Sequence, residues 1–432
     1  MKMTKLSAAL LSCCMLFSTA ACTKKSDDSG NNVRSGKDHP ADPTAIFELT
    51  DAKLPANSVS EDELKKAYSK FVFGVLQKCL ENAGDQNVLI SSDSILFALE
   101  LAAAGASGDT LDQMQNTMIP GVPNEQGFQF AVDRMDALSG DQISIANSAW
   151  LNNKMEADVY DDYLTFVQKH FDAEVQSVTF DSNAVKTINK WVEEKTDGMI
   201  DQLIDSISSD DLMILINAIC FDAEWEDPFK ESHVNDGYFY ETDGTEHEVK
   251  FLSGNQKDAK YLEGDTATGF LKEYEGGKYA FLTILPDDEE ADINEFMQNF
   301  SSEEYWELWE SRTGDVVLSY RFPEFKTEYS ASMKKPLMEM GMEEPFGRNA
   351  DFTNMTSEPV LIDDVIHKTY IEVTSKGTRA TAATAVEIRA YGMAISDPFE
   401  EIKYVICDRP FAYAIVDTET GLPVFLGTVE TV

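Results

Sequence analysis

The chain has 432 residues, of which 77 are Asp or Glu and 35 are Lys or Arg, so its formal net charge is −42. This length allows one large domain or several ordinary ones, and a hydrophobic content of 43% indicates a globular protein rather than a disordered acidic chain. The excess of acidic residues argues against nucleic acid as a partner and against a basic, membrane-seeking surface, because both need clustered positive charge.

The first residues have the pattern of an export signal. Lys2 and Lys5 precede an apolar run over residues 6–16, and small residues then lead to Cys22. A basic start, a short apolar segment and a small-residue cleavage site are typical of a secretory signal peptide. The position of Cys22 directly after two alanines resembles a bacterial lipoprotein signal, in which the cysteine is lipidated after cleavage. We therefore expect residues 1–21 to be removed and the protein to be exported, either lipid-anchored at Cys22 or freely secreted.

Two further regions follow this signal. Residues 22–50 begin with the candidate lipidated cysteine and are largely polar, so they are interpreted as a flexible tether. Residues 51–432 contain no Gly/Pro-rich linker, which favours one large domain.

Helices are predicted mainly in the first half of this domain. Ser60 and Glu63 have the spacing of a capping box, and apolar residues then recur at helical spacing up to Cys79. Similar patterns predict helices over 92–104, 158–171 and 183–195.

Strands are predicted mainly in the second half. The segments expected to form strands are 142–151, 213–221, 278–285, 314–322, 365–374, 404–407, 411–416 and 422–429. Early helices and late strands without a regular strand–helix alternation favour the α+β class.

No catalytic motif accompanies these elements. The sequence has no phosphate-binding glycine loop and no Gly-x-Ser-x-Gly nucleophile turn, and its five histidines are scattered without zinc-ligand spacing. The cysteines Cys79, Cys220 and Cys407 have apolar neighbours, and we interpret them as small buried side chains rather than nucleophiles. We expect no metal, no cofactor and no enzymatic activity.

One segment, residues 376–392, is too long for a hairpin turn although it lies between two strands. If it is extended, one face carries small and then β-branched residues, which is the pattern of a strand with one buried side. That face consists of Thr378, Ala380, Ala382, Thr384, Val386 and Ile388. The alanine-rich half is also compatible with a helix or with a plain surface loop. An exposed loop that can become a strand reconciles these features.

The chain resembles the serpins over residues 55–432. The resemblance depends on several separated motifs in the expected order: 87–94 with 105–110, 147–150, 188–200, 216–221 with 225–229, 341–352, 408–411 and 424–427. It implies an α+β fold of a single large domain, with a central, mostly antiparallel sheet, two smaller sheets, eight to nine helices and an exposed reactive-centre loop over about 376–397.

The resemblance also implies functional residues. The loop hinge would be Gly377, Thr378, Arg379, Ala380, Thr381, Ala382, Ala383 and Thr384. Control of sheet opening would fall to Ser91, Ser94, Asn217, Trp225 and His367. Ser92 departs from the family, which usually has proline at that position.

The implied activity is irreversible inhibition of serine proteases, and of some cysteine proteases. A protease cleaves the loop and becomes acylated, and the loop then inserts into the central sheet before the ester is hydrolysed. Family spacing places the cleaved bond between Tyr391 and Gly392, with Arg389 and Met393 as alternatives. Tyrosine favours a chymotrypsin-like or elastase-like target. The alternative function is that of a non-inhibitory serpin acting as a binding or chaperone-like surface protein.

The remaining partner predictions follow from charge. Some serpins are activated by heparin through a basic helical face, but residues 111–135 carry three acidic residues and only Arg134 as a base. We therefore expect no heparin activation, a monomer, and contact with a membrane only through the lipid at Cys22.

Overall fold

The structure is a computed structural model that describes residues 9–19, 55–154, 159–196, 198, 200–257, 259–314, 316–378 and 402–432. These residues contain nine α-helices and two short 3-10 helices. The α-helices are α1 (Glu61–Leu80), α2 (Ser92–Ala103), α3 (Gly108–Met118), α4 (Asn124–Leu138), α5 (Asp161–Phe171), α6 (Ser182–Lys195), α7 (Ile293–Asn299), α8 (Ser302–Glu310) and α9 (Lys334–Glu339). The 3-10 helices are η2 (Glu231–His233) and η3 (Glu344–Phe346).

The largest sheet has eight strands, seven of them in the order β4-β3-β5-β1-β14-β15-β6. The eighth, β13, pairs with the opposite edge of β14 from β1 and β15. The bounds of its strands are β1 (Ala9–Thr19), β3 (Ile143–Asn152), β4 (Ala173–Val178), β5 (Asp211–Phe221), β6 (Ala223–Glu224), β13 (Phe325–Ser332), β14 (Val360–Thr374) and β15 (Gly377–Thr378). All neighbouring strands run antiparallel except β3 and β4.

Two smaller sheets complete the described fold. A six-stranded sheet has the order β2-β18-β17-β11-β10-β9, and a four-stranded sheet has the order β16-β12-β8-β7. The six strands are β2 (Leu89–Ile90), β9 (Lys260–Glu263), β10 (Ala267–Glu273), β11 (Tyr279–Pro286), β17 (Phe411–Asp417) and β18 (Pro423–Val429). The four strands are β7 (Val234–Tyr240), β8 (Glu246–Lys257), β12 (Val317–Pro323) and β16 (Ile402–Ile406).

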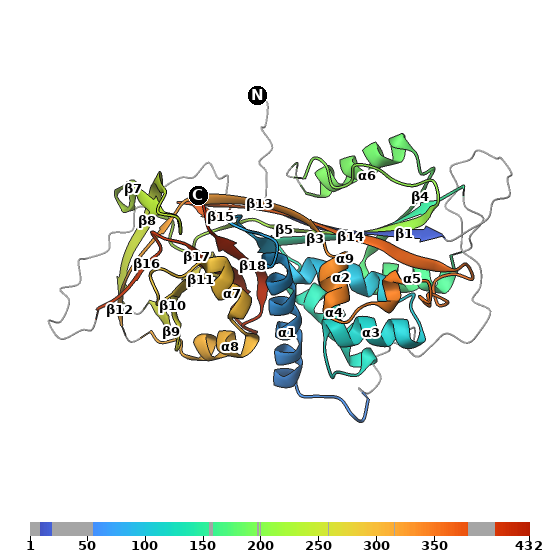
Figure 1. Ribbon diagram of the computed structural model, residues 1–432, viewed down its shortest axis with the longest axis horizontal. Coiled ribbons are helices and arrows are strands. Elements are labelled where there is room, and N and C mark those ends of the chain that lie inside the picture. Colours follow the sequence, from blue (N-terminus) through green and yellow to red (C-terminus); the bar gives the residue numbers. More distant parts are fainter. Residues whose placement is uncertain are drawn as a thin grey trace.

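The helices lie on both faces of the largest sheet. Figure 1 shows α2 beneath this sheet and α6 on its opposite face. Helix α2 is buried along its whole length and belongs to the main hydrophobic core. Helix α6 packs on a second, separate apolar cluster, in which Trp191 meets Trp150 of β3 edge to face at 6.1 Å between ring centroids. The sheet is therefore covered by two independent apolar layers.

Local sequence signals explain several of these elements. The predicted capping box is present at the start of α1, where the hydroxyl of Ser60 accepts from the N–H of Glu63 and the Glu63 carboxylate accepts from the N–H of Ser60 (2.9 Å). Asp181 caps α6 by accepting from the N–H of Asn183 (2.8 Å). Both helices begin within a residue or two of the predicted position.

The predicted fold class is confirmed, since a central, mostly antiparallel sheet, two smaller sheets and helices are all present. The thiols of Cys79 and Cys407 are buried and free, and burial raises the pKa of Cys79 to about 11. This is the behaviour of a core side chain rather than of a reactive thiolate. Residues 9–19, within the predicted signal, form strand β1, and their removal stays a prediction.

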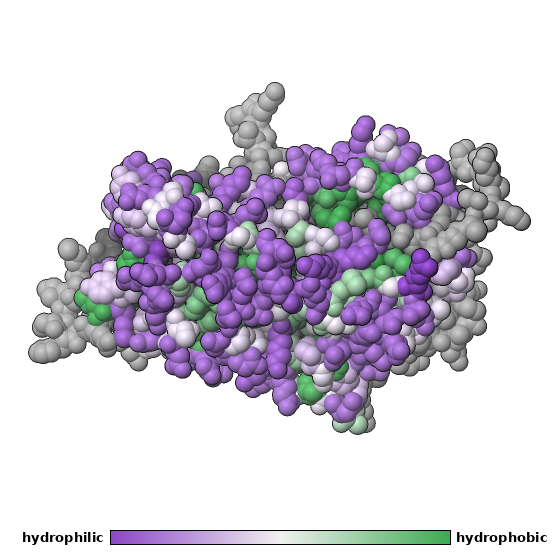
Figure 2. Space-filling view, in the orientation of Figure 1, coloured by the Kyte–Doolittle hydropathy of each residue, from purple (hydrophilic) through white to green (hydrophobic). Residues whose placement is uncertain are grey.

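The visible face of the molecule is mostly hydrophilic, with small separate hydrophobic areas (Figure 2). Among the described helices none is both long and apolar enough to cross a membrane.

Candidate functional site

The site lies at the centre of the largest sheet, where β1 fills the interval between β5 and β14. We call this interval the seam. At mid-length the backbone of Cys13 pairs with Asn217 on one wall of the seam and with His367 on the other. Two of the residues expected to control sheet opening therefore lie at the same level on opposite walls.

The first turn of α2 contacts both walls. The N–H of Ser91 donates to Nε2 of His367 on β14 (3.2 Å), and the hydroxyl of Ser94 donates to Oδ1 of Asn217 on β5 (2.6 Å). Ser91 also caps the helix, because its hydroxyl accepts from the N–H of Ser94 (3.2 Å). A single helical turn thus connects the two strands that would have to separate.

The hydrogen-bond chain continues into the neighbouring strand. Nδ2 of Asn217 donates to Oδ1 of Asn147 on β3 (2.9 Å), and Nδ2 of Asn147 donates to the carbonyl of Phe171 (2.7 Å). Both asparagine side chains are buried, where a lost hydrogen bond is costly. The structure thus brings together Ser91, Ser94, Asn217 and His367, while their control of opening stays a prediction.

The imidazole of His367 is held neutral. It is fully buried, its Nε2 accepts from Ser91, and so its proton is on Nδ1. Within the described ranges Nδ1 has no hydrogen-bond partner. Burial lowers the pKa of His367 from 6.5 to about 3, because the charged form would lose its hydration.

This shift predicts acid sensitivity. Because the unfolded chain protonates His367 below pH 6.5 and the folded chain does so only near pH 3, its stabilising contribution is complete above pH 6.5 and is lost as pH falls towards 3. We expect His367 to account for about 3 kcal/mol of lost unfolding free energy between pH 6.5 and about pH 4. The measurement is urea unfolding of the protein and of His367→Gln across this range. Parallel pH profiles for the two proteins would contradict the prediction.

Trp225 lies beyond the end of β5, at the end of the seam where β6 pairs with β15. We call this end the top of the seam. Its indole stacks on Tyr274, with 4.4 Å between ring centroids, and its Nε1 donates to the carbonyl of Thr374 (2.9 Å). The hydroxyl of Tyr274 in turn hydrogen-bonds the hydroxyl of Thr378. Trp225 is therefore apart from the α2 group, and its backbone N–H donates to the carbonyl of Lys376 (2.9 Å), at the start of the predicted loop.

Beside this aromatic group lies a buried lysine. Nζ of Lys272 is 4.7 Å from the ring centroid of Phe229 and donates to the carbonyl of Asp227 (3.0 Å). Burial lowers the pKa of Lys272 to about 8. The sequence does not distinguish this residue, since one lysine among acidic neighbours carries no distinctive pattern.

The first two hinge residues already belong to the sheet. Gly377 and Thr378 form β15, which pairs with β14 on one side and β6 on the other, and both residues are buried. A Cβ on Gly377 would lie 2.1 Å from the carbonyl oxygen of Ala223, so only glycine permits this approach.

The other predicted loop and anchor residues lie outside the described residues. These are the hinge residues Arg379, Ala380, Thr381, Ala382, Ala383 and Thr384, the cleavage candidates Arg389, Tyr391, Gly392 and Met393, and the lipidation candidate Cys22.

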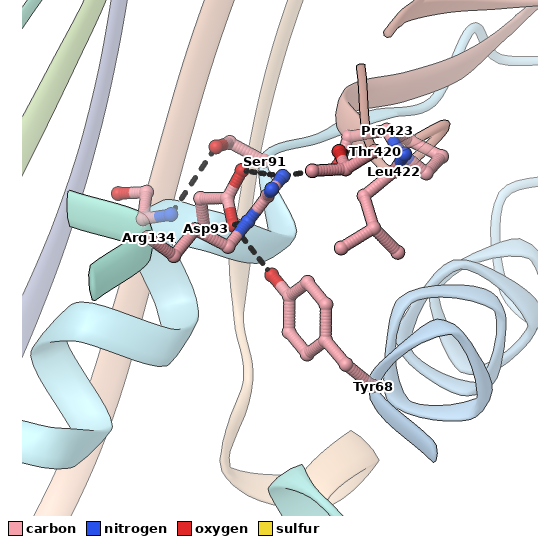
Figure 3. Close-up of polar contacts among 8 residues, drawn as sticks. Tyr68, Ser91, Asp93, Arg134, Thr420, Leu422 and Pro423 are labelled. Atoms are coloured by element: carbon pink, nitrogen blue, oxygen red, sulfur yellow. Dashed lines mark hydrogen bonds and ion pairs between the residues drawn. The ribbon is translucent and has the colours of Figure 1, made fainter. Parts of the chain in front are cut away.

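A buried ion pair behind the α2 turn was not predicted (Figure 3). Nη2 of Arg134, from α4, donates to Oδ2 of Asp93 (2.8 Å) and to the carbonyl of Pro423 (3.3 Å), and Nε of Arg134 contacts Oδ1 of Asp93. The hydroxyl of Tyr68, from α1, donates to Asp93 (2.8 Å). The available signal was Arg134 itself, the only base of an otherwise acidic segment.

The position of Asp93 connects this cluster with the seam. Asp93 lies between Ser91, which contacts β14, and Ser94, which contacts β5. Burial raises the pKa of the Asp93 carboxyl, and the Arg134 guanidinium opposes this shift. Through Tyr68 and Arg134, helices α1 and α4 thus fix the position of the first turn of α2. No metal-ligating group of three or more His, Cys, Asp or Glu occurs in the described part of the chain.

Comparison with known proteins agrees with this geometry. The family model "Serpin (serine protease inhibitor)" matches residues 66–432. A serpin-like protein of Methanosarcina mazei is 29% identical and is aligned over 90% of this chain and 93% of its own. The leukocyte elastase inhibitor of Bos taurus is 29% identical over 86% of this chain and 100% of its own. The native structure of the thermophilic serpin tengpin has 29% identity and a TM-score of 0.76, over 90% of this chain and 98% of its own. The chain belongs to the serpin family.

Proposed function

We propose that this serpin is an irreversible, suicide-substrate inhibitor of serine proteases. The observation that carries the proposal is β15, because Gly377 and Thr378 enter the sheet at the top of the seam. A loop that begins there has only to continue in the same direction, into the interval that β1 fills in the full chain, to become a central strand.

The proposed chemistry needs no catalytic group from the serpin. The protease serine attacks the carbonyl of Tyr391, the peptide bond to Gly392 breaks, and the new amino terminus leaves on Gly392. The protease remains esterified to Tyr391. Insertion of the loop then displaces and distorts the protease before water can hydrolyse this ester.

The driving force is strand addition, which inhibitors of this type use as a general device. About ten new ladder hydrogen bonds at about 1 kcal/mol each, together with buried side chains, supply on the order of 10–20 kcal/mol. The loop sequence supports insertion because residues 377–397 contain no proline and its predicted inward face is small or β-branched. The proposal extends to an exported monomer, lipid-anchored at Cys22 or secreted, whose targets are chymotrypsin-like or elastase-like.

The test uses the protein without residues 1–21 and measures formation of an SDS-stable complex with chymotrypsin and the mass of the released carboxy-terminal peptide. We expect a covalent complex and a peptide beginning at Gly392. Tyr391→Ala should lower the rate of complex formation by about tenfold or more, because the specificity pocket loses its aromatic ligand, whereas Arg389→Ala should leave it nearly unchanged.

Two outcomes would contradict parts of the proposal. A peptide beginning at another residue refutes the assigned bond. Clean loop cleavage without complex by every serine protease tried, including elastase and trypsin, refutes inhibition and favours a binding or chaperone-like role.

A further inference from the structure

Strand β1 is held in the seam by both neighbours. It pairs with β5 from Ala9 opposite Phe221 to Ser18 opposite Asp211. On the other side it pairs with β14 from Leu11 opposite Thr369 onward. Figure 1 shows this strand, in the blue of the amino terminus, within the plane of the largest sheet. An amino-terminal segment of the chain thus occupies a fully paired central position.

Strands β1 and β15 occupy consecutive parts of the same seam. Thr378 of β15 pairs with Val373 of β14, and both β15 and β1 run antiparallel to β14. If the loop strand continued in register, Ala382, four residues beyond Thr378, would lie opposite Thr369, four residues before Val373. Leu11 occupies that position.

The other wall gives the same alignment. Thr378 pairs with Ala223, so Ala380, two residues further on, would lie opposite Phe221. Ala9 occupies that position. Two independent registers therefore equate β1 with the loop strand, residue for residue, beginning with Ala9 at the place of Ala380.

The side chain of Met15 extends the match. Met15 is completely buried and lies between Leu215 and Val365. In the alignment it takes the place of Val386, which the alternation of the loop assigns to the inward face. Residues 9–19 contain no charged side chain, which suits a strand with two paired edges in the middle of a buried sheet.

We propose that residues 9–19 are an internal competitor of the reactive-centre loop for the seam. While the leader (residues 1–21) is attached, its strand β1 keeps the loop residues beyond Thr378 out of the seam. The chain is then cleaved as a substrate instead of trapping the protease. Removal of residues 1–21 frees the seam for the loop. This inference rests on the proposed inhibitory function. It makes the seam between β5 and β14 a binding site for an uncharged, apolar strand.

The experiment uses the full chain with single changes in the leader. Met15→Lys places a charge at a buried position and should expel β1, and Met15→Pro should do the same by removing a backbone donor from a central strand. Met3→Lys, outside the strand, is the matched control. Each protein is mixed with an equimolar amount of chymotrypsin, and the SDS-stable complex and the cleaved serpin are quantified.

We expect the full chain and Met3→Lys to be cleaved with a complex yield about tenfold or more below that of Met15→Lys. Equal yields from the full chain and from the Met15 variants, with complex formed by all of them, would overturn the competition. If Met15→Lys fails to fold, Met15→Pro gives the same comparison.

A second measurement separates this inference from the inhibitory function. A synthetic peptide with the sequence of residues 380–390 is added to each protein, and its binding is followed by fluorescence anisotropy. We expect binding to the Met15 variants about tenfold or more tighter than to the full chain and to Met3→Lys. If no protein traps chymotrypsin but the peptide discriminates in this way, the inhibitory function fails and the competition stands. Equal peptide binding by all proteins refutes the competition.

Discussion

Thr378→Arg is expected to convert the inhibitor into a substrate. Thr378 is fully buried between β14 and β6, and its hydroxyl hydrogen-bonds Tyr274. An arginine there would bury a charge without a partner. Burying an unpaired polar group already costs about 2–7 kcal/mol, and burying an unpaired charge costs more. Because Thr378 is already paired in β15, the arginine would displace β15 from the sheet, and the cleaved loop would then have to bury this charge before it could insert.

The measurement, in protein without residues 1–21, is the partition between SDS-stable complex and cleaved serpin after reaction with chymotrypsin. We expect the complex to fall by about tenfold or more while the loop is still cut at an unchanged rate. The matched control is Thr381→Arg, the same change three residues further on and on the face that the alternation assigns to solvent. An undiminished complex yield in Thr378→Arg would show that residue 378 does not have to stay buried during trapping.

Arg134→Met is expected to be the most destabilising single change in the cluster behind the α2 turn. It would leave the carboxylate of Asp93, whose side chain is fully buried, without its guanidinium partner. Breaking one side of a buried ion pair costs about 3–5 kcal/mol. The α2 turn that carries Ser91 and Ser94 should also become less firmly placed against the seam.

Urea unfolding measures the loss of stability. The rate at which the uncleaved protein without residues 1–21 loses inhibitory activity on incubation at elevated temperature measures premature insertion of the loop. The double variant Asp93→Val with Arg134→Met should recover most of the stability, because an apolar pair can replace a buried ion pair. Arg312→Met, which removes a guanidinium stacked on Trp309 at the surface of α8, is the control. A loss below about 1 kcal/mol for Arg134→Met would mean that the pair contributes no more than an exposed one.

The sequence predicted those elements that carry a local signal. Helix α1 has both a capping box and a regular apolar face, and its start was placed within one residue. Helices α3 and α4 were not predicted, and neither has a side-chain hydrogen bond at its N-cap to mark its start. The short helices α7, α8 and α9 were not predicted either, because helices of fewer than ten residues offer few turns over which a pattern can repeat. Strand β14 begins at Val360, five residues before the predicted start. The prediction began too late because two acidic residues at the end of the sheet, Asp363 and Asp364, interrupt the apolar pattern.

The site likewise contains residues that the sequence predicted and contacts that it did not. Its residues were found through the family resemblance, and no local pattern connects Ser91 with His367, which are 276 residues apart in the sequence. The ion pair of Asp93 with Arg134 joins different helices and depends on tertiary packing alone. The apolar run of the leader was visible, but its pairing partners were not, because a strand's register is set by the sheet that receives it.

The packing of α6 has an optical consequence. Its apolar layer includes Ile216 on one wall of the seam and Ile366 on the other. Withdrawing or inserting one strand changes the distance between these walls by about 4.8 Å, and the layer beneath α6 must rearrange to follow. Because Trp150 and Trp191 belong to that layer, intrinsic fluorescence would report whether the seam is filled, without any added label.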